Sequence, residues 1–297
     1  MWRIKFSTAS DFEVRKLSAV NLDGVLSVAD VKGVPVWWAE DGIYTVQYEA
    51  NFDAFSVQSL TEDTIKSFIL DIPRANRKYA KAVYDLQNDV VYWLFNDTNP
   101  LLEADRYTYN KILCLDGRTG AFYPWSVGTS TAKIRGAFYL RDANREEEAV
   151  LKFISTDLDS DIDYVTAFGG FINTDYLDWV EQGDSVDYTS YFITGYKIHG
   201  ETQRFSQSNY VFVFLETEAN SSCYMHAIYD YTNSGDSGKW SSSQQVYNSG
   251  LTHRDINYRR LKVRGKGRSI QLKFSSETSK PFNLIGWSLM ETQNSGI

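Results

Sequence analysis

The sequence is poor in cysteine, histidine and proline, and it contains no long apolar run. Its two cysteines stand 109 positions apart among 297 residues, which excludes a disulfide framework and a cysteine-rich metal site. We therefore expect Cys114 and Cys223 to be buried, reduced thiols of a protein made in a cytoplasm. No stretch approaches the roughly 18 apolar residues of a membrane-spanning helix, and polar residues follow the charged start. We expect neither membrane insertion nor a signal peptide.

The usual signatures of catalysis are also missing. The three histidines, His199, His226 and His253, stand 27 residues apart, a spacing that fits no metal site. No Gly-x-Ser-x-Gly elbow, phosphate-binding loop or dinucleotide fingerprint occurs. The sequence therefore predicts no catalytic residue and no cofactor. A triad assembled in space around one histidine, or a carboxylate pair for glycoside hydrolysis, stays open because only geometry would reveal it.

The run from Asp157 to Asp163 is the most metal-like motif. It alternates aspartate with other residues, as the first part of an EF-hand calcium loop does. Ile162 and Phe168 stand where that loop needs its glycine and its bidentate glutamate, so the EF-hand interpretation fails. A solvated acidic linker is the favoured interpretation and a looser cation site is the alternative; we predict no metal ligand.

Aromatic residues are abundant, at 15% of the chain, and they favour strands. Two apolar runs, 34–39 and 43–48, flank an Asp-Gly turn, which is a strong hairpin signal. The same pattern recurs over 81–95, 111–125 and 134–154. Hairpins joined to hairpins build propeller blades, so the sequence predicts a mainly β protein with a propeller-like N-terminal meander. With three or four recognisable units, the propeller can be incomplete.

One short helix is expected within this meander. Apolar residues recur at helical spacing over 65–72. Ser59 or Thr61 is the expected N-cap, and Pro73 should end the helix. We expect it to pack on the β body, and a partner-binding helix is the alternative.

The acidic stretch 157–187 is expected to link two domains, 1–156 and 188–297. In the second domain, apolar and polar residues alternate over 261–274 around a Gly-rich turn at 265–268. Such alternation is typical of half-buried antiparallel strands, so we predict a hairpin here and a C-terminal antiparallel β-sandwich. Five apolar residues should share one face of this hairpin: Leu261, Val263, Ile270, Leu272 and Phe274.

Charge is unevenly distributed along the chain. The net charge is −8, but residues 1–250 carry −14 and residues 251–297 carry +6. Six bases stand within ten residues without an acid: Arg259, Arg260, Lys262, Arg264, Lys266 and Arg268. Three interpretations are open. The bases form a solvated strand face, they contact a nucleic-acid backbone, or they dock on the acidic body of a neighbouring copy. We favour the third interpretation, because opposite potentials on one subunit suit head-to-tail contacts that close into rings. The turn 265–268 could also cradle a phosphate, but a tight turn explains its glycines better.

Three stretches resemble the tail nozzle proteins of short-tailed bacteriophages, also called DNA-stabilisation or tail tubular proteins. They cover 81–93 (KAVYDLQNDVVYW), 192–201 (FITGYKIHGE) and 259–272 (RRLKVRGKGRSIQL), the last continued by 280–288 (KPFNLIGWS). The resemblance implies a structural virion protein, not an enzyme, made in the host bacterial cytoplasm. Its propeller-like region and sandwich would build a ring, typically of six copies, at the distal end of the tail.

The resemblance also implies the partners of such a ring. It would extend the DNA channel, retain the packaged genome until ejection, and dock on a tail adaptor and on fibres or spikes. Viral DNA would be a passing cargo, which agrees with an acidic body that repels phosphate. The family's chains are usually longer, which leaves the closure of the propeller within this chain in question. A β-rich tail depolymerase or glycosidase, or a glycan-binding module, is the alternative function.

Overall fold

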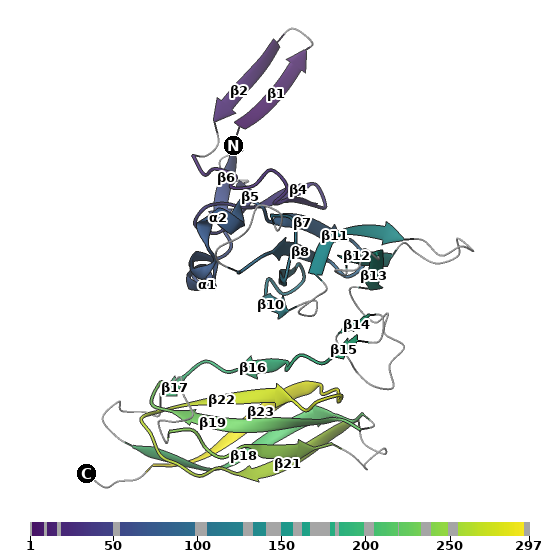
Figure 1. Cartoon of the computed structure of the whole chain (residues 1–297). Coiled ribbons are helices and arrows are strands. Elements are labelled where there is room, and N and C mark those ends of the chain that lie inside the picture. Colours follow the sequence, from purple (N-terminus) through teal and green to yellow (C-terminus); the bar gives the residue numbers. More distant parts are fainter. Residues whose placement is uncertain are drawn as a thin grey trace. The chain divides into compact units, whose positions relative to one another are not determined.

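The protein is mainly β, and its strands form several antiparallel sheets (Figure 1). The computed structural model describes residues 2–8, 11–16, 19–49, 54–98, 106–126, 133–140, 150–156, 162–166, 179–181, 184–198, 205–218, 220–232, 239–248 and 255–293. The chain divides into two compact units. Unit 1 comprises residues 1–170 and 179–184, and unit 2 comprises residues 171–178 and 185–297.

Unit 1 contains successive meanders in which each strand pairs with its neighbours in sequence. A two-stranded hairpin, β1 (Trp2–Thr8) with β2 (Asp11–Lys16), comes first. The first four-stranded sheet has the order β3 (Val28–Val31), β4 (Val34–Trp38), β5 (Ile43–Glu49), β6 (Ala54–Ser59). The second has the order β7 (Lys81–Asp85), β8 (Val90–Phe95), β9 (Lys111–Asp116), β10 (Phe122–Ser126). A third sheet contains β11 (Lys133–Leu140), β12 (Val150–Thr156) and β13 (Ile162–Thr166).

This arrangement confirms the predicted N-terminal β-meander and all four predicted hairpins, β4–β5, β7–β8, β9–β10 and β11–β12. Sequential antiparallel strands of this kind are the building plan of propeller blades. Within the described residues the three meanders are separate open sheets. Strand β13 lies in the stretch that we expected to be a linker, and it extends the third meander by pairing with β12. The aspartates at 157–161 lie outside the described residues.

Aromatic side chains join the first two four-stranded sheets. Trp38 of β4 meets Trp93 and Phe95 of β8 edge-on, with ring centroids 6.5 and 5.5 Å apart. All three side chains are buried, and the indole N–H of Trp93 donates to the carbonyl of Ser27 at 3.0 Å. Burial of side chains this large dominates the stability of a core. The sheets therefore share one core, to which Ile69 also belongs.

The predicted helix is present but differs in detail. It appears as α1 (Lys66–Asp71), followed after Pro73 by a single further turn, α2 (Arg74–Arg77). The predicted cap was wrong, because α1 begins after Ile65 and neither Ser59 nor Thr61 caps it. Ser59 instead caps the preceding turn by accepting the N–H of Glu62 at 3.1 Å. The buried Thr61 hydroxyl accepts the N–H of Ile43 at 3.0 Å, which ties it to the start of β5.

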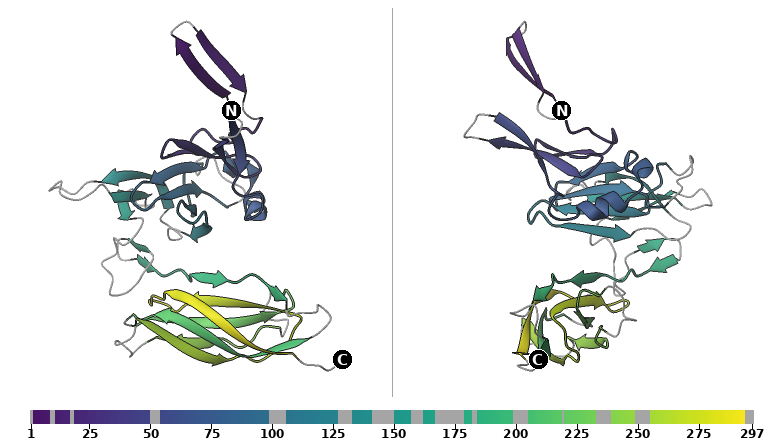
Figure 2. Two further views of the ribbon diagram at one scale, coloured as in Figure 1. Left: turned by 180° about the vertical axis from the view of Figure 1, so that it is seen from behind. Right: turned by 90° about the vertical axis from the view of Figure 1, so that its left-hand side faces the viewer.

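Unit 2 is the predicted antiparallel β-sandwich (Figure 2). One sheet has the order β16 (Tyr191–Ile193), β22 (Ser269–Ser276), β19 (Ser222–Tyr229), β20 (Gln244–Tyr247), and β17 (Lys197–Ile198) also pairs with β22. The other has the order β21 (Ile256–Lys262), β18 (Ser206–Glu216), β23 (Leu284–Gln293). A separate short pair is formed by β14 (Trp179–Glu181) and β15 (Asp184–Val186).

The predicted hairpin over 261–274 was wrong in its pairing. Strand β21 pairs with β18 in one sheet, and β22 pairs with β19 in the other. Residues 263–268 therefore cross between the two sheets of the sandwich. The inward face was predicted correctly, because Val263, Leu272 and Phe274 are buried in one shared core. Alternation shows which face of a strand is buried, but it does not show which strand lies alongside.

Candidate functional site

The six bases of 259–268 do not form one patch. Within β21, Arg260 pairs in register with Phe212 and Lys262 pairs with Tyr210, so both cations lie on the outer face of their sheet. The Arg260 guanidinium lies 4.8 Å from the centre of the Tyr210 ring. Arg259 alternates to the other face, and its Nε donates to the carbonyl of Tyr247 at 2.7 Å. The strand thus separates Arg259 from the other bases.

The remaining three bases, Arg264, Lys266 and Arg268, lie on the segment that crosses between the sheets. Two glycines hold this segment against Tyr229. Gly265 has φ +128°, and a Cβ there would lie 2.5 Å from the Tyr229 ring. A Cβ on Gly267 would lie 2.9 Å from the Tyr229 Cβ. The glycines are therefore needed for close packing, which favours the structural interpretation of this turn over a phosphate cradle.

Asp230 fixes the end of the crossing segment. Its carboxylate accepts the backbone N–H of Arg268 at 2.6 Å and pairs with Lys239 at 2.8 Å. Partial burial raises the pKa of this carboxyl, but these hydrogen bonds outweigh burial and the net pKa is lowered. The carboxylate is thus committed to the backbone and to Lys239, which leaves the side chain of Arg268 available at the surface.

Three exposed aromatic side chains gather around these bases, and the sequence analysis missed them. Phe205 precedes β18, and its ring lies 5.2 Å from the Arg268 guanidinium and 6.0 Å from Lys266 Nζ. Tyr196 and Tyr231 contact each other at 4.2 Å between ring centroids, and Tyr231 directly follows Asp230. We call the set the basic end of the sandwich: Tyr196, Phe205, Tyr231, Arg264, Lys266 and Arg268. These aromatics come from separate loops, so no local sequence signal marks them as neighbours.

The three bases of the basic end are exposed and form no ion pair within the described residues. Arg264, Lys266 and Arg268 are all exposed, and no carboxylate within the described part of the chain forms an ion pair with any of them. Tyrosine, phenylalanine and arginine are enriched at protein interfaces. The arrangement is suited to holding an anionic surface rather than to breaking a bond.

The other candidate residues show no reactive arrangement. Cys114 and Cys223 are buried and unpaired, as predicted, and burial raises the pKa of the Cys223 thiol to about 12. His226 is partly buried, with Nδ1 3.4 Å from the carbonyl of Ser241, whereas His199 and His253 lie outside the described residues. Among the residues that the structure describes, no group of three potential ligands could hold a metal ion, and no helix is long and apolar enough to cross a membrane.

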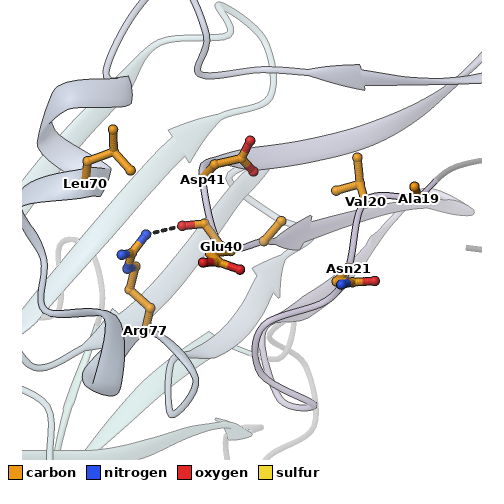
Figure 3. A pocket seen from close by; sticks show the side chains of 8 residues that line it. Ala19, Val20, Asn21, Glu40, Asp41, Leu70 and Arg77 are labelled. Carbon is orange, nitrogen blue, oxygen red and sulfur yellow. Dashed lines mark hydrogen bonds between the residues drawn. The ribbon is translucent and has the colours of Figure 1, made fainter.

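A hollow of about 480 Å³ lies in unit 1 beside the turn after β4 (Figure 3). Glu40 and Asp41 line it, and apolar walls come from Val20, Ala39 and Leu70. At its floor, the buried guanidinium of Arg77 donates from Nη1 to the Glu40 carbonyl. The hollow therefore combines aliphatic walls with carboxylates.

Asp23 lies close to the Arg77 guanidinium. Burial raises the pKa of the Asp23 carboxyl, the Glu40 charge adds to this effect, and Arg77, Arg74 and Lys78 oppose it. Its Oδ2 atom is buried and has no hydrogen-bond partner in the described residues.

No protein-family model matches the chain, and no curated protein matches its sequence.

Proposed function

We propose that this chain is a structural protein of a short bacteriophage tail, located in the virion. It assembles as a ring, the tail nozzle, which extends the DNA channel, retains the packaged genome and docks fibres or spikes. The observation that carries the proposal is the order of sheets: successive antiparallel meanders followed by a β-sandwich. The resemblance to tail nozzle proteins implies this same order.

The charge distribution supports a conduit for DNA. Residues 1–250 carry a net charge of −14, and an acidic wall repels the phosphate backbone instead of binding it. DNA would therefore pass as cargo. The three bases of the basic end lie in the final segment, 251–297, which carries +6, and there they are available for a protein contact.

The test is the state of assembly of the purified chain, alone and with the tail adaptor. We expect native mass spectrometry to show a homo-oligomer, six copies being the number that the resemblance implies, and negative-stain images to show rings. A strict monomer that docks on no tail component would overturn the proposal.

A glycan-binding module is a second candidate, favoured by the outer face of the sheet β21–β18–β23. Tyr258 is 56% exposed there, and its ring lies 6.5 Å from that of Phe214 in the neighbouring strand. Aromatic rings that share one open sheet face can stack on sugar rings, and Arg260 beside them could hold an acidic group. Binding of purified chain to a glycan array, lost in Tyr258→Ala, would support this candidate. Rings without glycan binding would exclude it.

A further inference from the structure

We propose that the basic end of one copy docks on an acidic rim of unit 1 in the next copy, and that repetition of this contact closes the ring. The acidic rim consists of four carboxylates on two turns. Glu40 and Asp41 line the hollow of Figure 3, and Glu62 and Asp63 lie on the turn that follows β6. The inference rests on the proposed ring, and it names both surfaces of the contact.

The acidic rim is held together by hydrogen bonds between two turns. The N–H of Ile43 donates to Thr61 Oγ1 at 3.0 Å, and the N–H of Leu60 donates to the carbonyl of Ile43 at 2.8 Å. These bonds place the turn that carries Asp41 next to the one that carries Asp63. The pKa of Tyr44, which lies between them, is raised to about 12 by burial and by the adjacent Asp41 carboxylate.

Two of the four carboxylates form no ion pair within the described part of the chain. Glu40 pairs with Arg74 at 2.7 Å, and Glu62 pairs with Lys66 at 2.6 Å. Asp41 accepts the hydroxyl of Tyr44 at 3.0 Å, and after Glu62 it also contributes to the raised pKa of Lys66. Neither Asp41 nor the exposed Asp63 forms an ion pair within the described ranges. The rim therefore carries an excess of negative charge, and the basic end carries an excess of positive charge.

The hollow beside the rim suits the side chains of the basic end. A lysine or arginine side chain combines an aliphatic stem with a charged head. Val20 and Leu70 supply apolar wall for the stem, and the carboxylate of Asp41 lies where the head would emerge. Arg77 also lines the hollow, and the nearby Asp23 carboxyl, which interacts with its charge, offsets part of its repulsion of an entering cation.

The two surfaces are different patches of the same chain. A contact between unlike patches is heterologous, and repeated heterologous contacts generate a closed ring when the rotation allows it. The three exposed aromatics would supply apolar contact area around the charged centre, as in other protein interfaces.

Two charge-reversed variants test the contact. The first carries Asp41→Lys and Asp63→Lys, so both of its surfaces are positive. The second carries Arg264→Glu, Lys266→Glu and Arg268→Glu, so both of its surfaces are negative. We expect each variant alone to lose assembly by at least tenfold at a given concentration, because like charges would face each other. Mixed in equal amounts, they should form rings in which the two variants alternate.

Matched controls keep the charge but change the side chain. Arg264→Lys with Lys266→Arg and Arg268→Lys, and separately Asp41→Glu with Asp63→Glu, should assemble as the natural chain does. Circular dichroism checks that every variant is folded. Native mass spectrometry would detect the alternating species, which a contact within one chain could not produce.

The outcomes separate this inference from the proposed function. If the natural chain forms rings and the charge-reversed variants also form them alone, the docking inference is wrong and the ring stands. If both variants fail alone and the mixture also fails, these two surfaces do not meet. If the natural chain is a monomer that docks on no tail component, the proposed function itself fails.

Discussion

At the scale of single residues, two glycines fix the shape of the basic end. Gly265 adopts a φ of +128°, which side chains rarely tolerate, and Gly267 lies directly against Tyr229. Neither position leaves room for a Cβ. The bases between and beside them therefore lie on a closely packed segment, which would lower the entropy lost in the proposed docking.

Replacing Gly265 with alanine should destabilise the sandwich by roughly 1–3 kcal/mol, through backbone strain and a clash with the Tyr229 ring. Chemical denaturation followed by fluorescence measures the change. Gly195→Ala is the matched control, because no atom lies within 4 Å of a Cβ there and its φ is not positive. Equal losses in both variants would contradict the packing argument.

Asp23 is a second residue whose environment has a measurable consequence. Its pKa in the folded protein lies above the ordinary value of 3.8, chiefly because of burial. The folded state then binds the proton more tightly than the unfolded state does. The stability contributed by this group therefore falls as pH rises from about 3.8 through the folded pKa.

Asp23→Asn should remove that loss. The free energy of unfolding of this variant, relative to that of the natural chain, should therefore rise with pH over this range and then level off.

Asp116→Asn should show the opposite dependence on pH. The backbone N–H of Arg118 holds the pKa of Asp116 below its ordinary value, so this carboxylate stabilises the fold at neutral pH and loses that effect in acid. Thermal unfolding between pH 3 and 7 distinguishes the two trends.

At the scale of elements, strand β8 is the centre of unit 1. It is buried over its whole length and pairs with β7 on one side and β9 on the other. Trp93 links it to β4 of the preceding sheet and to the Ser27 carbonyl. The packing of successive meanders therefore depends on this strand.

Trp93→Ala should lower the free energy of unfolding by about 3–5 kcal/mol, because it leaves a large cavity and removes the indole hydrogen bond to the Ser27 carbonyl. Leu86→Ala, in the turn before β8, is the control. Leu86 is 67% exposed, so the change should stay within about 0.5 kcal/mol. A small effect at Trp93 would show that the meanders do not share a cooperative core.

At the scale of the whole molecule, the net charge of −8 conceals a separation of charge. The acidic part carries −14 and the final segment carries +6, and the proposed ring would bring these opposite charges of neighbouring copies together. Exposed charges interact over about 10 Å at 0.1 M salt and about 3 Å at 1 M. The proposed contact should therefore be sensitive to ionic strength.

Ring assembly should weaken progressively between 50 mM and 1 M NaCl, as measured by sedimentation velocity. Tyr231→Ala should weaken it at every salt concentration, because that change removes apolar contact and leaves the charges in place. Assembly that persists unchanged in 1 M NaCl would point to an apolar interface elsewhere on the chain.

The sequence by itself determined the local features of this protein. Turn residues and apolar runs determined the hairpins β4–β5 and β7–β8, because both signals act between neighbours in the chain. Alternation determined that Val263 and Phe274 face a core. Only the tertiary structure decided that β21 and β22 belong to opposite sheets, since a strand's pattern shows its buried face and not its partner.

The same limit applies to the candidate site. The run of bases was visible in the sequence, but the fold divided it. Arg259 turns to the other face of its strand, and Lys266 and Arg268 lie beside Phe205. Likewise, hydrogen bonds from the start of β5 brought Asp41 beside Asp63. Contacts between residues far apart in sequence depend on how sheets and loops pack, which no local pattern encodes.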